Sequence, residues 1–213
     1  MREQVIKSIL ENKIIAIVRG IDVDSAVEVA KALYKGGIKL IEVTFNQKLP
    51  ESFVDTVNSI KLIKKNCPDI IVGAGTVLNT EQVDLAISGG AEYIISPDTD
   101  KSVIEYSVKK GLVSLPGAYT ATEVKTAHLA GADFVKLFPC SDVQYLKALK
   151  APLSHVKFLA VGGVNVDNAL DFIKAGAVGV GVGSSLVKKE WVENKEFDKL
   201  TQLAKKFVEK VGE

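Results

Sequence analysis

Short apolar runs rich in β-branched residues alternate with amphipathic helical stretches along the whole chain, and this alternation restricts the possible folds more than any other feature. The runs are bounded by glycine or proline and carry few polar residues, which is typical of strands buried on both faces. A further helix is expected before the first strand, and a last helix near residues 195–211. We expect eight strands, at residues 14–19, 40–45, 70–74, 93–96, 112–115, 134–138, 156–161 and 178–182.

A weak internal repeat supports the same interpretation. Several predicted strands follow a glycine at the expected helix end, where a left-handed backbone is needed. Successive glycines lie 53, 21, 20 and 45 residues apart, which fits one or two strand-plus-helix units. This repetition favours one (β/α)8 (TIM) barrel domain with an extra N-terminal helix over residues 1–213. An open, doubly wound sheet is the alternative, because periodicity does not reveal closure. The glycines are Gly37, Gly90, Gly111, Gly131 and Gly176.

Composition argues against several classes of function. The 213 residues include 27 basic and 26 acidic ones, so the net charge of +1 creates no global field that would attract nucleic acid. No apolar run approaches the roughly 20 residues that span a bilayer, and the N-terminal stretch lacks the pattern of a signal peptide. The two cysteines, Cys67 and Cys140, provide no disulfide framework. We therefore expect a cytoplasmic protein that binds neither nucleic acid nor membrane.

Lys136 is the charged residue that fits its predicted position least well. It lies in the apolar run 134–138, and a lysine is almost never fully buried unless it is paired or functional. Burial would lower its pKa and leave a neutral, nucleophilic amine near pH 7. The alternative is a lysine that reaches solvent at the barrel end or pairs with a carboxylate. Lys157, at the start of the next strand, is interpreted as structural.

Glu42 presents the same conflict with the opposite charge, inside the predicted strand 40–45. A carboxyl group in a barrel interior must be ion-paired, hydrogen-bonded or protonated. With Lys136 it could form a purely structural ion pair, or it could act as a base beside a reactive amine. A neighbouring charge and an apolar wall shift the pKa in opposite directions, so the sequence leaves the direction open. Arg19, Thr44 and Thr76 are further polar residues at predicted strand ends.

Glycine-rich stretches end the last two predicted strands, at residues 161–165 and 179–185. In barrels, the loops after these strands commonly bind phosphate through backbone N–H groups, so we expect an anion site there. Neither stretch matches a dinucleotide fingerprint, and residues 73–76 lack the lysine of a P-loop, so no nucleotide cofactor is expected. His128 and His155 belong to no ligand cluster, so no metal site is expected either.

Several short motifs follow one another in a specific order. Together they resemble the 2-keto-3-deoxy-6-phosphogluconate / 4-hydroxy-2-oxoglutarate (KDPG/KHG) aldolase family of bacteria, over essentially the whole chain. The resemblance implies a homotrimeric (β/α)8 barrel without a cofactor and a class I mechanism, in which a lysine forms an imine with the substrate ketone. The motifs are Ile41-Glu42-Val43-Thr44, Val72-Gly73-Ala74-Gly75-Thr76-Val77, Ile95-Ser96-Pro97, Leu115-Pro116-Gly117, Phe134-Val135-Lys136-Leu137-Phe138-Pro139, Gly162-Gly163-Val164 and Gly183-Ser184.

The resemblance also implies roles for individual residues. Lys136 matches the Schiff-base lysine of the family, and Glu42 matches its general acid/base. The implied reaction cleaves KDPG to pyruvate and glyceraldehyde 3-phosphate, or KHG to pyruvate and glyoxylate. The matching substrate-binding positions are Arg19, Thr76, Pro97, Thr120, Phe138, Gly162, Gly163 and Ser184.

Two positions depart from the family pattern. Many relatives carry an arginine where this chain has Asn46, and Pro-Thr where it has Ala160-Val161. The threonine hydroxyl that is lost would contribute about 1 kcal/mol to a hydrogen bond. The lysine and glutamate are unaffected, but the substrate stays open, with an aldolase for the galactonate-derived epimer as the nearest alternative. A phosphosugar isomerase or epimerase on the same barrel, and a non-catalytic ligand-binding barrel, are the more distant ones.

Overall fold

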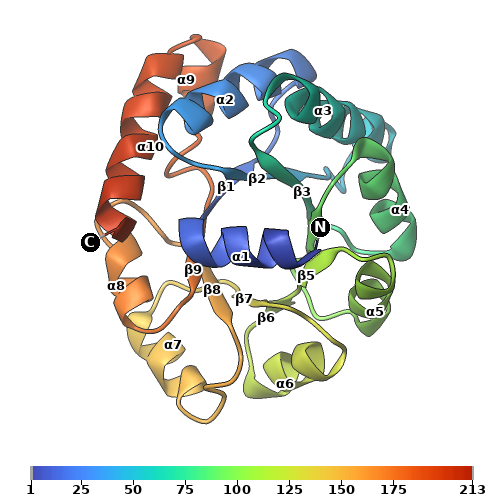
Figure 1. Ribbon diagram of the computed structural model, residues 1–213, viewed down its shortest axis with the longest axis vertical. Helices are drawn as coiled ribbons and strands as arrows, with labels where there is room; N and C mark the ends of the chain where they lie inside the picture. Colours follow the sequence, from blue (N-terminus) through green and yellow to red (C-terminus); the bar gives the residue numbers. More distant parts are fainter. Residues whose placement is uncertain (1, 213) are drawn as a thin grey trace.

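The computed structural model describes residues 2–212, in which strands and helices alternate around a central barrel (Figure 1). The strands are β1 (Ile14–Val18), β2 (Leu40–Thr44), β3 (Ile71–Gly75), β4 (Tyr93–Ile95), β5 (Val113–Leu115), β6 (Gly117–Ala118), β7 (Val135–Leu137), β8 (Phe158–Val161) and β9 (Gly179–Val182). The helices are α1 (Arg2–Asn12), α2 (Val23–Lys35), the 3-10 turn η1 (Pro50–Ser52), α3 (Phe53–Asn66), α4 (Thr80–Gly89), α5 (Lys101–Lys109), α6 (Ala121–Leu129), α7 (Val143–Lys150), α8 (Ala169–Lys174), α9 (Lys189–Glu193) and α10 (Phe197–Gly212).

The parallel sheet closes on itself between β5 and β6. The strand order is β5-β4-β3-β2-β1-β9-β8-β7-β6, and only Pro116 separates the two outermost strands along the chain. The backbone N–H groups of Phe134 and Lys136 donate to the carbonyl oxygens of Ser114 (3.3 Å) and Pro116 (2.9 Å), so β5 and β6 act as one barrel strand. The TIM-barrel prediction is therefore confirmed, including the N-terminal helix, and the open sheet is excluded.

The fifth predicted strand was too short. The sequence ended it at Leu115, whereas the structure continues it beyond Pro116 as β6. Proline has no N–H to donate, so it interrupts the hydrogen-bond ladder on one side without turning the chain away. The glycines of the predicted repeat all have positive φ, as expected at helix ends. Their φ values are 93° for Gly37, 90° for Gly90, 80° for Gly111, 95° for Gly131 and 102° for Gly176.

Two apolar layers result from the alternation of side chains along the strands. In β1, Ile14, Ala16 and Val18 face the surrounding helices, whereas Ile15 and Ile17 face the barrel interior. Every residue of β1 is consequently buried, which explains why the strand reads as one continuous apolar run. A polar residue that points inward from such a strand has no access to bulk water, except at an open end of the barrel.

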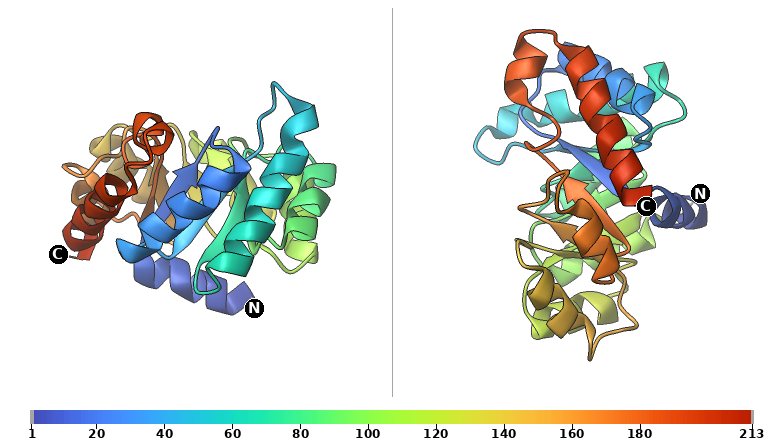
Figure 2. Two further views of the ribbon diagram at one scale, coloured as in Figure 1. Left: turned by 90° about the horizontal axis from the view of Figure 1, so that it is seen from above. Right: turned by 90° about the vertical axis from the view of Figure 1, so that its left-hand side faces the viewer.

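Helix α1 closes one end of the barrel. Its residues Val5 and Ile9 pack in the same interior cluster as Leu40 and Phe134. Figures 1 and 2 show the helix lying across the end of the barrel, beneath the N-terminal ends of the strands. An ion pair between Arg2 and Asp133 (2.6 Å) fastens it to the segment before β7. The opposite end, where the strands finish, is the end at which a substrate can enter.

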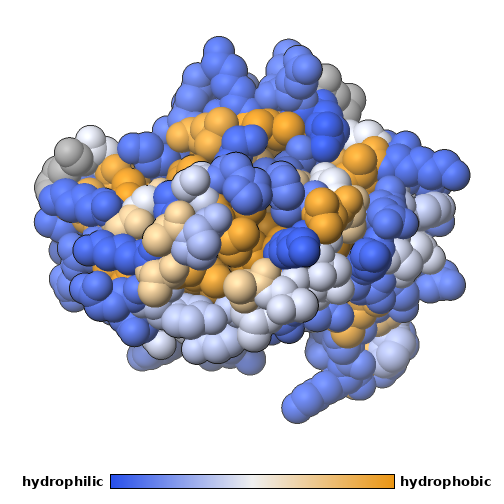
Figure 3. Space-filling model, turned by 90° about the horizontal axis from the view of Figure 1, so that it is seen from below, coloured by the Kyte–Doolittle hydropathy of each residue, from blue (hydrophilic) through white to orange (hydrophobic). Residues whose placement is uncertain are grey.

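The outer surface carries some apolar side chains. Figure 3 shows one face on which apolar residues (orange) lie among hydrophilic ones (blue). Within residues 2–212, no helix has both the length and the apolar character that crossing a lipid bilayer requires. The large apolar side chains that are exposed are Tyr34, Leu49, Val54, Leu78, Leu85, Ile87, Tyr119 and Leu129.

Candidate active site

Lys136 projects into the barrel interior from β7. Its neighbours Val135 and Leu137 face the helices, and the residue itself is only 5% exposed. Its Nζ lies 4.6 Å from the ring centroid of Phe138. An amine in these surroundings loses the hydration that stabilises its charge, so burial lowers the pKa of Lys136 below its usual value.

Glu42 reaches the same interior from β2. It is 1% exposed, and its Oε1 is buried without a hydrogen-bond partner. The carboxyl group occupies space that Gly75 of β3 leaves free, since a methyl group at that position would overlap Oε1 and Cδ of Glu42. A glycine in the neighbouring strand therefore makes room for a buried acid, at a place where a larger residue would exclude it.

Lys136 and Glu42 influence each other without forming a direct ion pair, because no nitrogen–oxygen distance between them lies within 4.0 Å. Burial is the largest influence on both groups: it raises the pKa of Glu42 and lowers the pKa of Lys136. The charge of each partner acts in the opposite sense, while Arg19 lowers both pKa values. Both side chains are thus shifted toward their neutral forms, which answers the question that the sequence left open.

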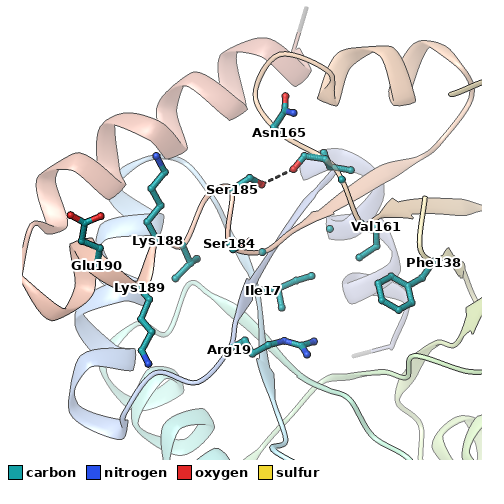
Figure 4. A pocket seen from close by; sticks show the side chains of 16 residues that line it. Ile17, Arg19, Phe138, Val161, Asn165, Ser184, Ser185, Lys188, Lys189 and Glu190 are labelled. Carbon is teal, nitrogen blue, oxygen red and sulfur yellow. Dashed lines mark hydrogen bonds between the residues drawn. The ribbon is translucent and has the colours of Figure 1, made fainter. Parts of the chain in front are cut away.

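A cavity of about 740 Å³ opens at the carboxyl ends of β1, β8 and β9. In Figure 4, Arg19, Phe138 and Val161 surround this space. Lys136 and Glu42 do not line it but lie deeper in the barrel, and Phe138 connects the two regions because it lines the cavity and contacts the lysine. Of the predicted substrate-binding residues, the cavity gathers Arg19, Phe138, Gly162, Gly163 and Ser184.

The glycine-rich loops form one wall of the cavity. Gly162 and Gly163 have φ values of 100° and 76°, and a side chain on Gly162 would come within 3.2 Å of the Pro139 backbone. Both the conformation and the close approach therefore require glycine at these positions. Ser185 donates its hydroxyl to the carbonyl of Val164 (2.6 Å), whereas Ser184 is exposed to the cavity. Of the two serines, Ser184 is the one whose hydroxyl is free to meet a ligand.

Arg19 and Thr76 lie together at the rim of the barrel. The guanidinium of Arg19 donates to Thr76 Oγ1 at 3.4 Å. Thr76 itself has a φ of 57°, a conformation that costs energy for a β-branched residue. Gln47 donates to the Thr76 carbonyl (2.6 Å) and exchanges hydrogen bonds with Gln82, which fixes this turn. Gln47 could not be recognised from the sequence, since glutamines in loops are ordinary.

Pro97 and Thr120 do not line the cavity. Thr120 is the N-cap of α6 and forms a capping box with Glu123: its Oγ1 accepts from the Glu123 N–H (3.3 Å) and donates to Oε2 (2.9 Å). The structure thus shows a helix-capping contact for the Thr120 hydroxyl. Pro97 lies beside Gly117, where any side chain would overlap the Pro97 carbonyl.

The two departures from the family pattern lie in different places. Val161 lines the large cavity, so the missing hydroxyl changes the surface that a ligand meets. Asn46 does not line that cavity but borders a smaller one of about 390 Å³, and its Oδ1 accepts from the Lys48 N–H (3.2 Å). Of the two, Val161 is therefore the one placed to affect ligand selection directly.

Several residues of the region were not predicted from the sequence. Lys188, Lys189 and Glu190 line the outer part of the cavity and are exposed. Tyr93 is fully buried in the barrel interior, and its hydroxyl has no hydrogen-bond partner. A charged run before a short helix usually indicates a solvated surface, and a tyrosine in a strand usually fills space. Neither pattern distinguishes these residues without the fold.

No three His, Cys, Asp or Glu side chains gather as a metal site anywhere in the described chain, residues 2–212. The ring of His128, in α6, meets the ring of His155, before β8, edge to face with the centroids 4.8 Å apart. Lys157, just before β8, is exposed and lies 5.7 Å from the ring of Phe134.

Comparisons with known proteins point to one group. The family model described as KDPG and KHG aldolase matches residues 5–203. A 2-dehydro-3-deoxy-6-phosphogalactonate aldolase of Escherichia coli K12 is 38% identical over 178 residues, covering 82% of this chain and 84% of that protein. The KHG/KDPG aldolase of the same strain is 33% identical over 189 residues, covering 87% and 86%.

A solved structure extends the likeness to three dimensions. The KDPG aldolase from Legionella pneumophila, with pyruvate captured at low pH as a covalent carbinolamine intermediate, is similar with a TM-score of 0.84. It shares 25% identity with this chain, and the comparison covers 94% of this chain and 96% of that one.

Proposed function

Because the chain belongs to the KDPG and KHG aldolase family, and is thus a carbon–carbon lyase, we propose that it works by a metal-independent class I mechanism on KDPG and KHG. The observation that carries the mechanism is the Lys136 amine, held in an apolar barrel interior that shifts it toward its neutral form. A neutral amine can add to a ketone without a metal or an organic cofactor. Glu42 shares that interior and is the proposed acid and base.

The proposed reaction begins with addition of the Lys136 amine to the C2 ketone, followed by loss of water to give a protonated imine. Glu42, through a water molecule, removes the proton of the C4 hydroxyl, whose oxygen becomes the aldehyde carbonyl as the C3–C4 bond breaks. The imine accepts the electron pair of that bond and becomes an enamine. Protonation at C3 and hydrolysis then release pyruvate and restore the amine of Lys136.

The cavity supports an acid with a distal anionic group. Gly162, Gly163 and Ser184 would bind that group through backbone N–H groups and a hydroxyl, as barrel loops at this position commonly do. Arg19, hydrogen-bonded to Thr76, would meet the carboxylate of the substrate. Phe138 would pack against the chain between the two charged ends. Pro97 and Thr120 would line the pocket mouth; this assignment rests on the family resemblance alone.

Trapping of the imine tests the mechanism. Sodium borohydride added with pyruvate should reduce the imine to a stable secondary amine, detected by mass spectrometry as an adduct on Lys136. Lys136→Met should lose both the adduct and turnover, because no other residue can replace the nucleophile. Lys157→Met is the matched control, since Lys157 lies at the opposite end of the barrel, and it should keep both. Active protein without an adduct would favour a phosphosugar isomerase or epimerase, which needs no imine.

A second candidate substrate is the galactonate-derived epimer of KDPG. Val161 supplies methyl groups to the cavity where many relatives have a threonine, which alters contacts near the reacting carbons. The relative that is 38% identical is a phosphogalactonate aldolase, which supports the same option. Steady-state kcat/KM values for the two phosphorylated epimers and KHG decide between the candidates, and a higher value for the galactonate epimer would displace KDPG as the main substrate.

We also propose that the enzyme is a cytoplasmic homotrimer, following its family. Leu49, Val54 and Leu78 are exposed on neighbouring elements and would be covered by contacts between copies. Sedimentation velocity should give a mass of three chains, and a monomer at all concentrations would contradict the proposal.

A further inference from the structure

Tyr93 brings a third polar group into the part of the barrel that holds Glu42. The residue is 0% exposed and packs in the interior cluster with Ile95, Val113 and Phe134. Its hydroxyl oxygen is buried without a hydrogen bond of good geometry, with only the Gly73 backbone N–H acting on it, and Glu42 Oε1 is buried without a partner. Buried polar atoms are almost always satisfied. Two such unsatisfied atoms in the same interior therefore point to a hydrogen bond that forms between them at some stage of the reaction.

The strand register places the two residues on either side of β3. Glu42 of β2 is paired with Gly73, and Ala74 is paired with Ile94, so Tyr93 of β4 lies on the other side of Gly73. In TIM barrels, the inward side chains of alternate strands, as β2 and β4 are here, stack in layers. No side chain of β3 separates them, because the residue between them is a glycine.

The glycines of β3 also show where the two side chains go. A methyl group at Gly73 would overlap the Tyr93 ring, and a methyl group at Gly75 would overlap the Glu42 carboxyl group. Both side chains therefore extend over β3, at successive inward positions of that strand. The Tyr93 ring lies over Gly73 and the Glu42 carboxyl group over Gly75, and the charge of Glu42 acts on the Tyr93 hydroxyl.

We propose that Tyr93 is a positioning residue for Glu42, whose hydroxyl donates a hydrogen bond to the Glu42 carboxylate when that group ionises during catalysis. The proposal rests on the proposed function, in which Glu42 must ionise to take the C4 hydroxyl proton. In the empty barrel, burial shifts Glu42 toward its neutral form. A hydrogen bond from the tyrosine stabilises a neutral carboxyl group less than an ionised one. Tyr93 acts only through Glu42 and does not itself contact the substrate.

Tyr93 is suited to remain a donor throughout the working pH range. Burial, reinforced by the charges of Glu42 and Glu92, raises the pKa of its hydroxyl well above the usual value, so the proton stays on the oxygen. The other charges that act on Glu42 are those of Lys136 and Arg19. Lys136 is committed to the substrate once the imine has formed, which leaves the tyrosine as a neutral donor that the chemistry does not consume.

The test is the pH dependence of Tyr93→Phe, which removes the hydroxyl and keeps the ring. The limb of the kcat profile that belongs to Glu42 is first identified as the one that Glu42→Gln abolishes. Without the donor, the ionised carboxyl is less stable, so this limb should move upward by about one pH unit. Tyr106→Phe is the matched control, because the Tyr106 hydroxyl binds Asp84 on the outer surface (2.9 Å), and it should leave the profile unchanged.

A second variant should shift the Glu42 limb of the kcat profile in the opposite direction. Replacing Tyr93 with 3-fluorotyrosine keeps the ring and makes the hydroxyl a stronger donor, so the same limb should move downward; this variant also serves if Tyr93→Phe does not fold. In the Glu42→Gln background, Tyr93→Phe should cause no further shift. An unmoved limb in both Tyr93 variants, with normal activity at the optimum, would overturn the inference and leave the aldolase assignment intact.

Failure of the proposed function would look different. If the wild-type protein shows neither turnover nor a borohydride adduct, the proposed aldolase reaction, in which Glu42 ionises, would be wrong. The titration of the Glu42 carboxyl group, followed by its infrared C=O band without substrate, would then still report whether Tyr93→Phe shifts it. An unshifted band would overturn the hydrogen bond itself.

Discussion

A lysine amine attacks a ketone only when it is neutral, and in this barrel burial lowers the pKa of Lys136 toward that form. Lys136 has apolar residues on both sides along β7, and its Nζ lies over the Phe138 ring rather than against a carboxylate. Glu42 shares the interior but makes no ion pair with it, so its charge only partly offsets the effect of burial. The same burial that lowers the pKa of the lysine therefore raises the pKa of the acid.

Competitive labelling should reveal the lowered pKa of Lys136. With trace acetic anhydride and mass spectrometry, its labelling should reach a plateau at a lower pH than that of an exposed lysine such as Lys101, because a lowered pKa gives more neutral amine at any given pH. In Glu42→Gln the plateau should come at a still lower pH, since the negative charge that favours the ammonium form is gone. Labelling of Lys136 in parallel with Lys101 would contradict the proposed activation.

The residues that could be predicted from the sequence are those whose type conflicts with their position. Lys136 and Glu42 were recognisable because charges rarely occur inside apolar strands. Tyr93 gave no such conflict, since tyrosine is common in strands and only the fold shows that its hydroxyl is buried without a partner. Thr120 illustrates the reverse, because its family position predicted a pocket role while its observed contacts are those of a helix cap.

At the scale of the element, β3 contributes to the site because it has no side chain at two inward positions. Gly73 and Gly75 point inward and provide the space that Tyr93 and Glu42 occupy. Strands β1, β2 and β8 carry large apolar side chains inward, such as Ile15, Leu40 and Leu159, whereas β9 resembles β3 in having glycine at its inward positions. The two glycines of β3 therefore leave room for Tyr93 and Glu42 within a largely apolar interior.

Gly75→Ala tests this role of β3. The added methyl group would overlap the Glu42 carboxyl group and must displace it, so kcat should fall by about 100-fold or more, the usual contribution of a positioned acid or base. Overpacking should also lower the free energy of unfolding by about 1–3 kcal/mol. Gly212→Ala, at the end of α10 with no atom nearby, is the control and should change neither quantity appreciably. Wild-type kcat in Gly75→Ala would show that the carboxyl position is not critical.

The existence and type of the elements followed from the sequence, but some of their limits did not. Apolar runs and glycine caps are local features, so they predict strands and helix ends from neighbouring residues alone. The end of the fifth strand depends on β4 and β7, which pair with β5 and β6 from opposite sides. The C-terminal end of the fifth strand is therefore determined by closure of the barrel, and the residues around Pro116 do not predict it.

At the scale of the whole molecule, the apolar core is divided by the barrel wall. One layer joins the strands to the outer helices, and a second fills the interior down to α1. This division lets the interior hold a destabilising pair of ionisable groups near one end, while the outer layer and the closed end keep the fold. The loops that carry the cavity can then vary without disturbing either layer.

The buried pair should therefore weaken the fold that holds it. Glu42 has a folded pKa above its unfolded one, so its contribution lowers stability as pH rises above the ordinary glutamate range. Lys136 has a folded pKa below its unfolded one, so its contribution lowers stability as pH falls below the ordinary lysine range. Both penalties are present near pH 7.

Replacing both groups with neutral ones of similar shape should remove both penalties. Lys136→Met/Glu42→Gln, although inactive, should be more stable than wild type by about 1–4 kcal/mol near pH 7, with a flatter dependence of stability on pH. Urea unfolding at acidic, neutral and basic pH measures this difference. The exposed pair Lys110 and Asp84 (3.1 Å) provides the control, since Lys110→Met/Asp84→Asn should leave stability nearly unchanged. A double variant that is less stable than wild type would mean that Lys136 and Glu42 hold the barrel together rather than strain it.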